Sequence, residues 1–130
     1  MAHKIFIIDD EKSILFLSKA ILVTAGYSVS TESDSTRAYQ AVLNAKPDLI
    51  LMDIAMPEVN GIELARNIRA NPTLKDTHIF ALTGMPELIN EHNRIYFEKI
   101  IIKPFHMDSL LAELKNFFAG QIVAAYAEKK

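Results

Sequence analysis

The chain of 130 residues has the length of one ordinary domain, and half of its residues are hydrophobic, so it can bury a core of useful size. Its 14 basic and 16 acidic residues give a net charge of −2, which argues against a large basic surface for nucleic acid or anionic membranes. The absence of cysteine excludes disulfides, thiolate nucleophiles and cysteine-based zinc sites. We expect one compact cytoplasmic domain, with no membrane insertion and no direct contact with nucleic acid.

Short apolar runs alternate with stretches of helical periodicity along the whole chain. Such runs, without polar alternation, are typical of strands buried on both faces of a parallel sheet. Strands are predicted over residues 5–8, 27–31, 49–52, 79–82 and 100–102. Helices are predicted over residues 11–25, 35–45, 61–70 and 87–95, and from residue 107 or 108 to 118.

Residues with known capping roles mark several of these helix boundaries. Gly26 can end the first helix, and Asp34 or Ser35 can cap the second. For the last helix, core contact is expected as far as Phe118. Apolar residues continue beyond Gly120, and an extended helix there could serve dimerisation or the attachment of another domain.

Five strands that alternate with helices predict an α/β fold, with a parallel sheet covered by helices on both faces. In such sheets the functional groups lie beyond the carboxyl ends of the strands. Four of the five predicted strands end in a polar group: Asp9-Asp10, Asp53, Thr83 and Lys103. We therefore predict that these side chains meet at one edge of the sheet.

The chemistry of these groups points to phosphoryl transfer. Three carboxylates at one edge would repel one another unless they bind a hard divalent cation, and Mg²⁺ suits a site with few protein ligands and a phosphate. Lys103 supplies a mobile cation and Thr83 a hydroxyl donor for phosphoryl oxygens. A carboxylate nucleophile, a metal ion and a cation suffice for this reaction. Each residue alone has a common role as a cap, turn or surface charge, so the prediction depends on their joint placement.

These motifs and their spacing resemble the receiver domain of response regulators. The resemblance covers about residues 3–119 and leaves residues 120–130 as a C-terminal helix extension or tail of a single domain, 1–130. It implies a doubly wound, flavodoxin-like fold with strand order 2-1-3-4-5. The matching motifs are Asp9-Asp10, Leu51-Met52-Asp53-Ile54-Ala55-Met56-Pro57 with Gly61, Thr83-Gly84, and Lys103-Pro104-Phe105.

The resemblance implies a phosphorylation switch of a two-component system or phosphorelay, not a conventional enzyme. Asp53 would accept a phosphoryl group from a histidine kinase or histidine phosphotransfer protein. Asp10, Asp53 and the backbone carbonyl of Ala55 would ligate Mg²⁺, with Asp9 acting directly or through water. The chain would then signal by binding a downstream protein or output domain, with a homodimer as one possible form, or would pass the phosphoryl group on.

The same resemblance assigns roles to the two remaining strand-end groups. Thr83 would bind the phosphoryl group, and Lys103 would pair with Asp53 and then with a phosphoryl oxygen. The peptide bond between Lys103 and Pro104 is expected to be cis, as in similar proteins.

The chain departs from the usual receiver pattern at three positions. Ile100 stands where such domains usually carry Tyr or Phe, so the usual coupling between the Thr and an aromatic ring is not expected here. Ala55 and Met85 stand where many relatives carry polar side chains that help to orient the attacking water. We therefore expect a long-lived phosphoaspartate.

Two other functions fit the residues less well. An aspartate-nucleophile phosphatase would carry a second acid two residues after the nucleophile, where this chain has Ala55. A flavin or dinucleotide binder would carry a Gly-x-Gly-x-x-Gly motif after the first strand, which the sequence lacks. The four histidines, His3, His78, His92 and His106, show no spacing typical of a metal site.

Overall fold

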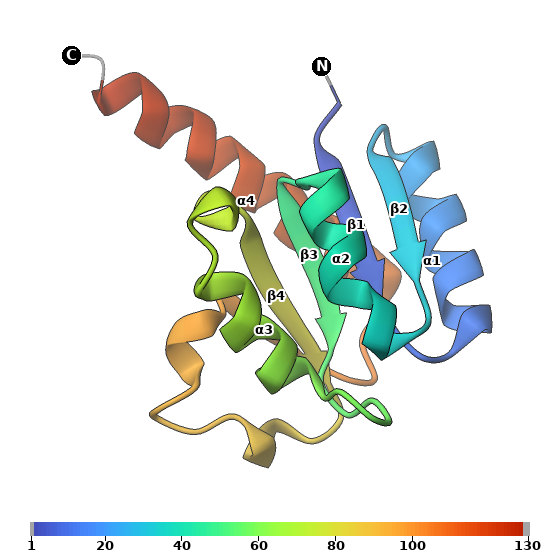
Figure 1. The fold of residues 1–130 in the computed structure, drawn as a ribbon. Coiled ribbons are helices and arrows are strands. Elements are labelled where there is room, and N and C mark those ends of the chain that lie inside the picture. Colours follow the sequence, from blue (N-terminus) through green and yellow to red (C-terminus); the bar gives the residue numbers. More distant parts are fainter. Residues whose placement is uncertain (1, 129–130) are drawn as a thin grey trace.

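The computed structural model of this chain describes the backbone of residues 2–128 and the side chains of residues 2–122. Its centre is a five-stranded, all-parallel sheet in the order β2-β1-β3-β4-β5, which confirms the predicted topology (Figure 1). The strands are β1 (Lys4–Ile8), β2 (Ser28–Glu32), β3 (Leu49–Asp53), β4 (His78–Thr83) and β5 (Lys99–Ile102).

Helices cover both faces of this sheet, as predicted. Helices α2 (Ser35–Ala45) and α3 (Gly61–Arg69) pack on one face, and α1 (Lys12–Thr24) and α4 (Met107–Glu128) pack on the other (Figure 1). Each face therefore has its own hydrophobic cluster. This layering explains why all five residues of the central strand β3 are buried.

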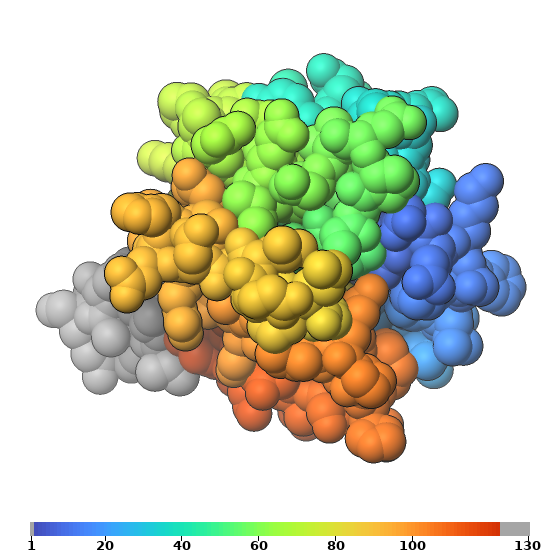
Figure 2. Space-filling view, turned by 90° about the horizontal axis from the view of Figure 1, so that it is seen from below, coloured from blue at the N-terminus to red at the C-terminus, as the bar shows by residue number. Residues whose placement is uncertain are grey.

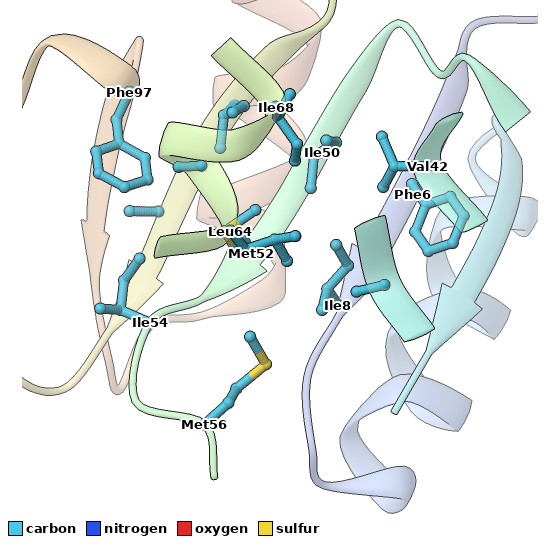
Figure 3. Close-up of a cluster of buried hydrophobic side chains, with 14 of the residues drawn as sticks. Phe6, Ile8, Val42, Ile50, Met52, Ile54, Met56, Leu64, Ile68 and Phe97 are labelled. Carbon is cyan, nitrogen blue, oxygen red and sulfur yellow. The ribbon is translucent and has the colours of Figure 1, made fainter. Parts of the chain in front are cut away.

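The cluster beneath α2 and α3 lies beside the site described below (Figure 3). Side chains of β1, β3, α2 and α3 meet in it, and residues of the segment after β3 extend it towards the carboxyl ends of the strands. Ile54 and Met56 of that segment are both buried. The labelled members are Phe6, Ile8, Val42, Ile50, Met52, Ile54, Met56, Leu64, Ile68 and Phe97.

Polar side chains set the start of two helices on that face. Asp34 caps α2 by accepting a hydrogen bond from the Thr36 amide at 2.9 Å, and Asn60 caps α3 in the same way from the Glu63 amide at 2.9 Å. Of the two predicted caps for the second helix, Asp34 is the correct one. Gly26 follows α1 with a φ of +102°, a left-handed conformation that favours glycine.

The helix predicted around residues 87–95 was wrong. This interval contains only two short 3-10 turns, Pro86–Leu88 and Arg94–Tyr96. Asparagine side chains here accept hydrogen bonds from backbone amides that would otherwise bond within a helix. Asn90 Oδ1 accepts from the amides of His92 and Asn93 at 2.9 and 3.1 Å. Asn93 Oδ1 accepts from the Asn90 amide at 2.8 Å. The connection from β4 to β5 therefore has no α-helix.

Arg69, at the end of α3, holds the far end of this connection in place. Its guanidinium donates to the carbonyls of Thr77 and Tyr96 at 2.6 and 3.0 Å and to the Glu98 carboxylate at 2.9 Å. Glu98 in turn accepts from the Ile79 amide at 2.6 Å. One side chain thus joins the entry to β4, the entry to β5 and the last 3-10 turn.

The last helix, α4, continues beyond Phe118, the residue at which its contact with the core was predicted to end. Leu110, Leu114 and Phe118 of α4 are buried, which agrees with contact as far as Phe118, while Ile122 is exposed. The His3 ring stacks on Phe118 with centroids 3.9 Å apart. Among the helices of residues 2–128, none is long and apolar enough to cross a membrane.

Candidate functional site

The predicted strand-end residues lie at the edge where the parallel strands terminate. Figure 2 views this edge, where the segments that follow β1 (blue), β3 (green), β4 (yellow) and β5 (orange) meet on one face. Asp9 and Asp10 follow β1, Asp53 and Thr83 are the last residues of β3 and β4, and Lys103 follows β5.

Three carboxylates form an acidic cluster at this edge. Oxygen atoms of Asp9, Asp10 and Asp53 lie within 4.8 Å of one another. The Asp9 and Asp53 side chains are buried, whereas Asp10 is exposed. Among the described residues, this is the one group of three or more acidic or histidine side chains close enough to share a metal ion. Carboxylate oxygens are the ligands that Mg²⁺ prefers, so the donor set fits the predicted ion.

Lys103 reaches into the acidic cluster from the other side. Its Nζ donates to Asp9 Oδ2 at 3.0 Å and lies 3.7 Å from Asp53 Oδ1. The other oxygen of Asp9 accepts from the Glu11 amide at 3.0 Å. Both oxygens of Asp9 therefore have partners within the chain. Lys103 thus forms an ion pair with Asp53, as the family resemblance implied, and a closer one with Asp9.

The acidic cluster changes the proton affinity of Asp53. Burial, together with the neighbouring charges of Asp9 and Asp10, raises the pKa of Asp53 to about 6, although the Lys103 ammonium opposes this shift. In the metal-free protein, ionised Asp53 therefore lowers the stability of the folded state at neutral pH. A divalent cation between the carboxylates would remove that cost.

Lys103 stays charged in this environment. Its burial acts to lower the pKa of the ammonium, but the hydrogen bond to Asp9 and the negative charges of Asp9, Asp53 and Glu11 outweigh burial and raise the pKa overall. A fixed positive charge thus lies against the two buried carboxylates.

Thr83 is fully buried at the end of β4. Its hydroxyl oxygen accepts a hydrogen bond from the Met85 amide at 2.9 Å, and its carbonyl accepts from the Lys103 amide at 2.9 Å. In the sheet, its neighbour Leu82 pairs with Asp53. The Thr83 hydroxyl still has its own proton to donate, because the bond from Met85 uses a lone pair of the oxygen.

Gly61 fixes the backbone immediately after Asp53. Its amide donates to the Ile54 carbonyl at 2.8 Å. A Cβ atom at this position would lie 2.6 Å from the Asp53 carbonyl oxygen and 2.8 Å from Ile54 Cα. Only glycine allows α3 to start this close to β3. The predicted ligand Ala55 is exposed in the same loop.

The departure at Ile100 is visible in the structure. Ile100 is partly buried and packs against the cluster beneath α2 and α3, in which Phe97 is buried. An isoleucine at this position offers no ring that could move between exposed and buried orientations. The Met85 amide, which donates to the Thr83 hydroxyl, begins the connection between β4 and β5, and that connection has no α-helix.

An apolar cavity of about 400 Å³ opens beside the acidic cluster. It lies between α1 and the segment that joins β5 to α4. Lys103 contributes to its wall, so the cavity and the charged site share a border. The other lining residues are Ile14, Leu17, Ser18, Pro104, Phe105 and Met107.

The site lies in a chain that matches a known family. The family model of the response regulator receiver domain matches residues 5–115. Chemotaxis protein CheY of Bacillus subtilis is 30% identical over 117 residues, which cover 89% of this chain and 98% of CheY. The alkaline phosphatase synthesis transcriptional regulatory protein PhoP of Bacillus subtilis is 41% identical over 127 residues, which cover 96% of this chain and 52% of PhoP.

Solved structures show the same fold. Response regulator protein TrrA of Thermotoga maritima, in complex with Mg²⁺-BeF, is similar with a TM-score of 0.79 and 29% identity over 89% of this chain and 98% of that chain. Chemotaxis response regulator CheY4 of Vibrio cholerae is similar with a TM-score of 0.81, 30% identity and the same coverage of 89% and 98%. This chain spans about half the length of the transcriptional regulators that it matches. The match over most of the chain shows that this protein belongs to the response regulator receiver domain family of two-component signalling.

Proposed function

We propose that this chain is a Mg²⁺-dependent phosphorylation switch whose phosphoryl acceptor is Asp53. One observation carries the proposal: two buried carboxylates, a third exposed one and a partly buried lysine meet where the strands end, beside the buried Thr83. A charge cluster of this kind is costly for a structural role alone, because burial and the repulsion from Asp9 and Asp10 disfavour the ionised form of Asp53, although Lys103 pairs with the buried carboxylates. Ligand binding and phosphoryl transfer give it a function.

Asp10, Asp53 and the carbonyl of Ala55 are proposed to hold Mg²⁺, with Asp9 acting directly or through water. When bound, the ion supplies positive charge to the carboxylates and to the incoming phosphoryl group. Asp9 is already oriented for this role, because the Glu11 amide and Lys103 fix both of its oxygens. Asp10 is exposed and can turn towards an ion without breaking a buried contact.

In the proposed reaction, a carboxylate oxygen of Asp53 attacks the phosphorus of a donor, which is a phosphohistidine of a kinase or phosphotransfer protein. The bond from phosphorus to the donor breaks, and the donor leaves with its electron pair. Lys103, 3.7 Å from Asp53, neutralises an oxygen of the transferred group. The Thr83 hydroxyl donates to another oxygen.

The apolar cavity beside Lys103 is proposed to receive the protein that delivers the phosphoryl group. Leu17 at its rim is exposed, as is Phe16, the preceding residue of α1. Contact there would exclude water from the side of the acidic cluster, which strengthens its electrostatic interactions. The chain then acts as a signalling switch through its partners.

The acceptor can be tested with Mg²⁺ and acetyl phosphate by measuring the intact mass. The wild type should gain one phosphoryl group, and Asp53→Asn should gain none. Asp76→Asn, an equivalent change at an exposed aspartate outside the site, should behave as the wild type. A mass gain that survives in Asp53→Asn would place the acceptor elsewhere, and no gain in the wild type would contradict the proposed function.

The phosphorylated form is expected to last for minutes or longer. The side chains of Ala55 and Met85 carry no hydroxyl, amide or charged group, so neither offers a strong hydrogen bond that could orient an attacking water. Release of inorganic phosphate from the purified phosphoprotein measures this lifetime. Ala55→Asn should shorten it several-fold, whereas loss of the phosphoryl group from the wild type within seconds would contradict the expectation.

A further inference from the structure

The loop between β3 and α3, residues 54–60, adopts a tight and strained backbone. The Met56 amide donates to the Ile54 carbonyl at 3.1 Å, and the Val59 amide donates to the Pro57 carbonyl at 2.8 Å, so two three-residue turns follow each other. Glu58, between Pro57 and Val59, has a φ of +68°. A residue with a side chain adopts this left-handed conformation at a cost, and the surrounding structure must hold it there.

Ser35, the first residue of α2, forms hydrogen bonds to both ends of the turn 57–59. Its hydroxyl donates to the Pro57 carbonyl at 2.6 Å and accepts from the Val59 amide at 3.2 Å. These partners lie 22 and 24 residues further along the chain, and Ser35 is only 6% exposed. One buried hydroxyl thus bridges the two ends of the strained turn from a different element.

Among the described residues, Ser35 is the only partner outside the loop that hydrogen bonds to residues 55–59. The two turns are internal to the loop, and the Gly61 amide contacts its first residue, Ile54. The Met56 side chain is buried, so it anchors the loop by apolar packing. The polar restraint on this stretch therefore comes from α2.

We infer that Ser35 is a positioning residue that holds the Ala55 carbonyl where the Mg²⁺ site needs it. The inference rests on the proposed function, because it takes Ala55 as a ligand. Without the hydroxyl, the Pro57 carbonyl and the Val59 amide lose a shared partner, and the strained turn is free to relax. Ala55, two residues before Pro57, then loses its fixed orientation, and an ion that needs near-ideal geometry binds less tightly.

Mg²⁺ affinity, measured by calorimetry on the whole chain, tests this inference. Ser35→Ala removes the hydroxyl, and Ser35→Gly removes it with a different backbone effect. Thr36→Ala is the matched control, because the Thr36 hydroxyl lies at the same helix start but bonds to Asp34 at 2.6 Å and not to the loop. Both Ser35 variants should weaken Mg²⁺ binding by roughly fivefold, because only part of the effect of the two lost hydrogen bonds reaches Ala55. Thr36→Ala should match the wild type.

A second readout needs no metal. Hydrogen exchange of the Val59 amide should accelerate about tenfold in Ser35→Ala relative to the core strands, and remain unchanged in Thr36→Ala. Unchanged Mg²⁺ affinity in both Ser35 variants would overturn the inference alone, as would an equal loss in Thr36→Ala. A wild type that binds no Mg²⁺ would overturn the proposed function together with the inference.

Discussion

A Gly61→Ala substitution is expected to destabilise this protein by about 3 kcal/mol or more, because the new methyl group would overlap backbone atoms. Its Cβ would lie 2.6 Å from the Asp53 carbonyl oxygen and 2.8 Å from Ile54 Cα. A flexible side chain could move away from such a contact, but these atoms belong to β3 and to the residue that follows it. Relief requires α3 to move away from the strand that carries the acceptor.

Urea denaturation at equilibrium measures this effect, and Gly120→Ala provides the control. Nothing lies within 4 Å of a Cβ at Gly120, which is inside α4, so alanine there should stabilise the helix by about 0.5–1 kcal/mol. Gly61→Ala should also weaken Mg²⁺ binding, since Asp53 is displaced with the strand end. Equal stability of Gly61→Ala and the wild type would show that α3 can shift freely.

Asp53→Asn should make the metal-free protein more stable at neutral pH, although it removes the reactive group. The folded pKa of Asp53 is about 6, above the ordinary value of 3.8 that applies when the chain is unfolded. Between these two values the folded state binds more protons than the unfolded state, so stability falls as pH rises through this window. Above pH 6 the full cost of ionised Asp53 is present, and it amounts to about 1–3 kcal/mol. Asparagine carries no such cost.

Denaturation in EDTA at two pH values tests this expectation. The variant should be more stable than the wild type at pH 7.5, and the difference in stability should vanish below about pH 3, where Asp53 is protonated in both the folded and the unfolded state. Asp76→Asn, at an exposed position, should leave stability unchanged at either pH. Saturating Mg²⁺ should stabilise the wild type and narrow the gap. A less stable Asp53→Asn at pH 7.5 would show that the carboxylate is held by favourable contacts.

The fold and the members of the acidic cluster could be predicted because both depend on strong local signals. A strand buried on both faces, such as β3, has no room for polar alternation, so Asp53 at its end is conspicuous. Parallel topology then places the ends of separate strands together. Nothing more than strand order was needed to bring Lys103 to Asp9 and Asp53.

The structural features that the sequence did not predict depend on side-chain contacts, some of them between residues far apart in the chain. Residues 87–95, between β4 and β5, were predicted to form a helix, but the side chains of Asn90 and Asn93 accept hydrogen bonds from the local amides instead. Ser35 looked like a possible helix cap, and its partners lie in a loop 22 residues away. The ion pair of Lys103 with Asp53 was expected, whereas its closer contact with Asp9, at 3.0 Å, was not.

The direction in which β1 and α4 run has a practical consequence for handling this protein. β1 starts at the end of the sheet opposite the acidic cluster, and α4 runs from the cluster's side back past that end (Figure 1). An affinity tag, fluorophore or surface tether attached at either end of the chain would therefore emerge on the side away from Asp53. The protein can be immobilised through either end in one orientation, with the phosphorylation edge facing the solution and open to a partner.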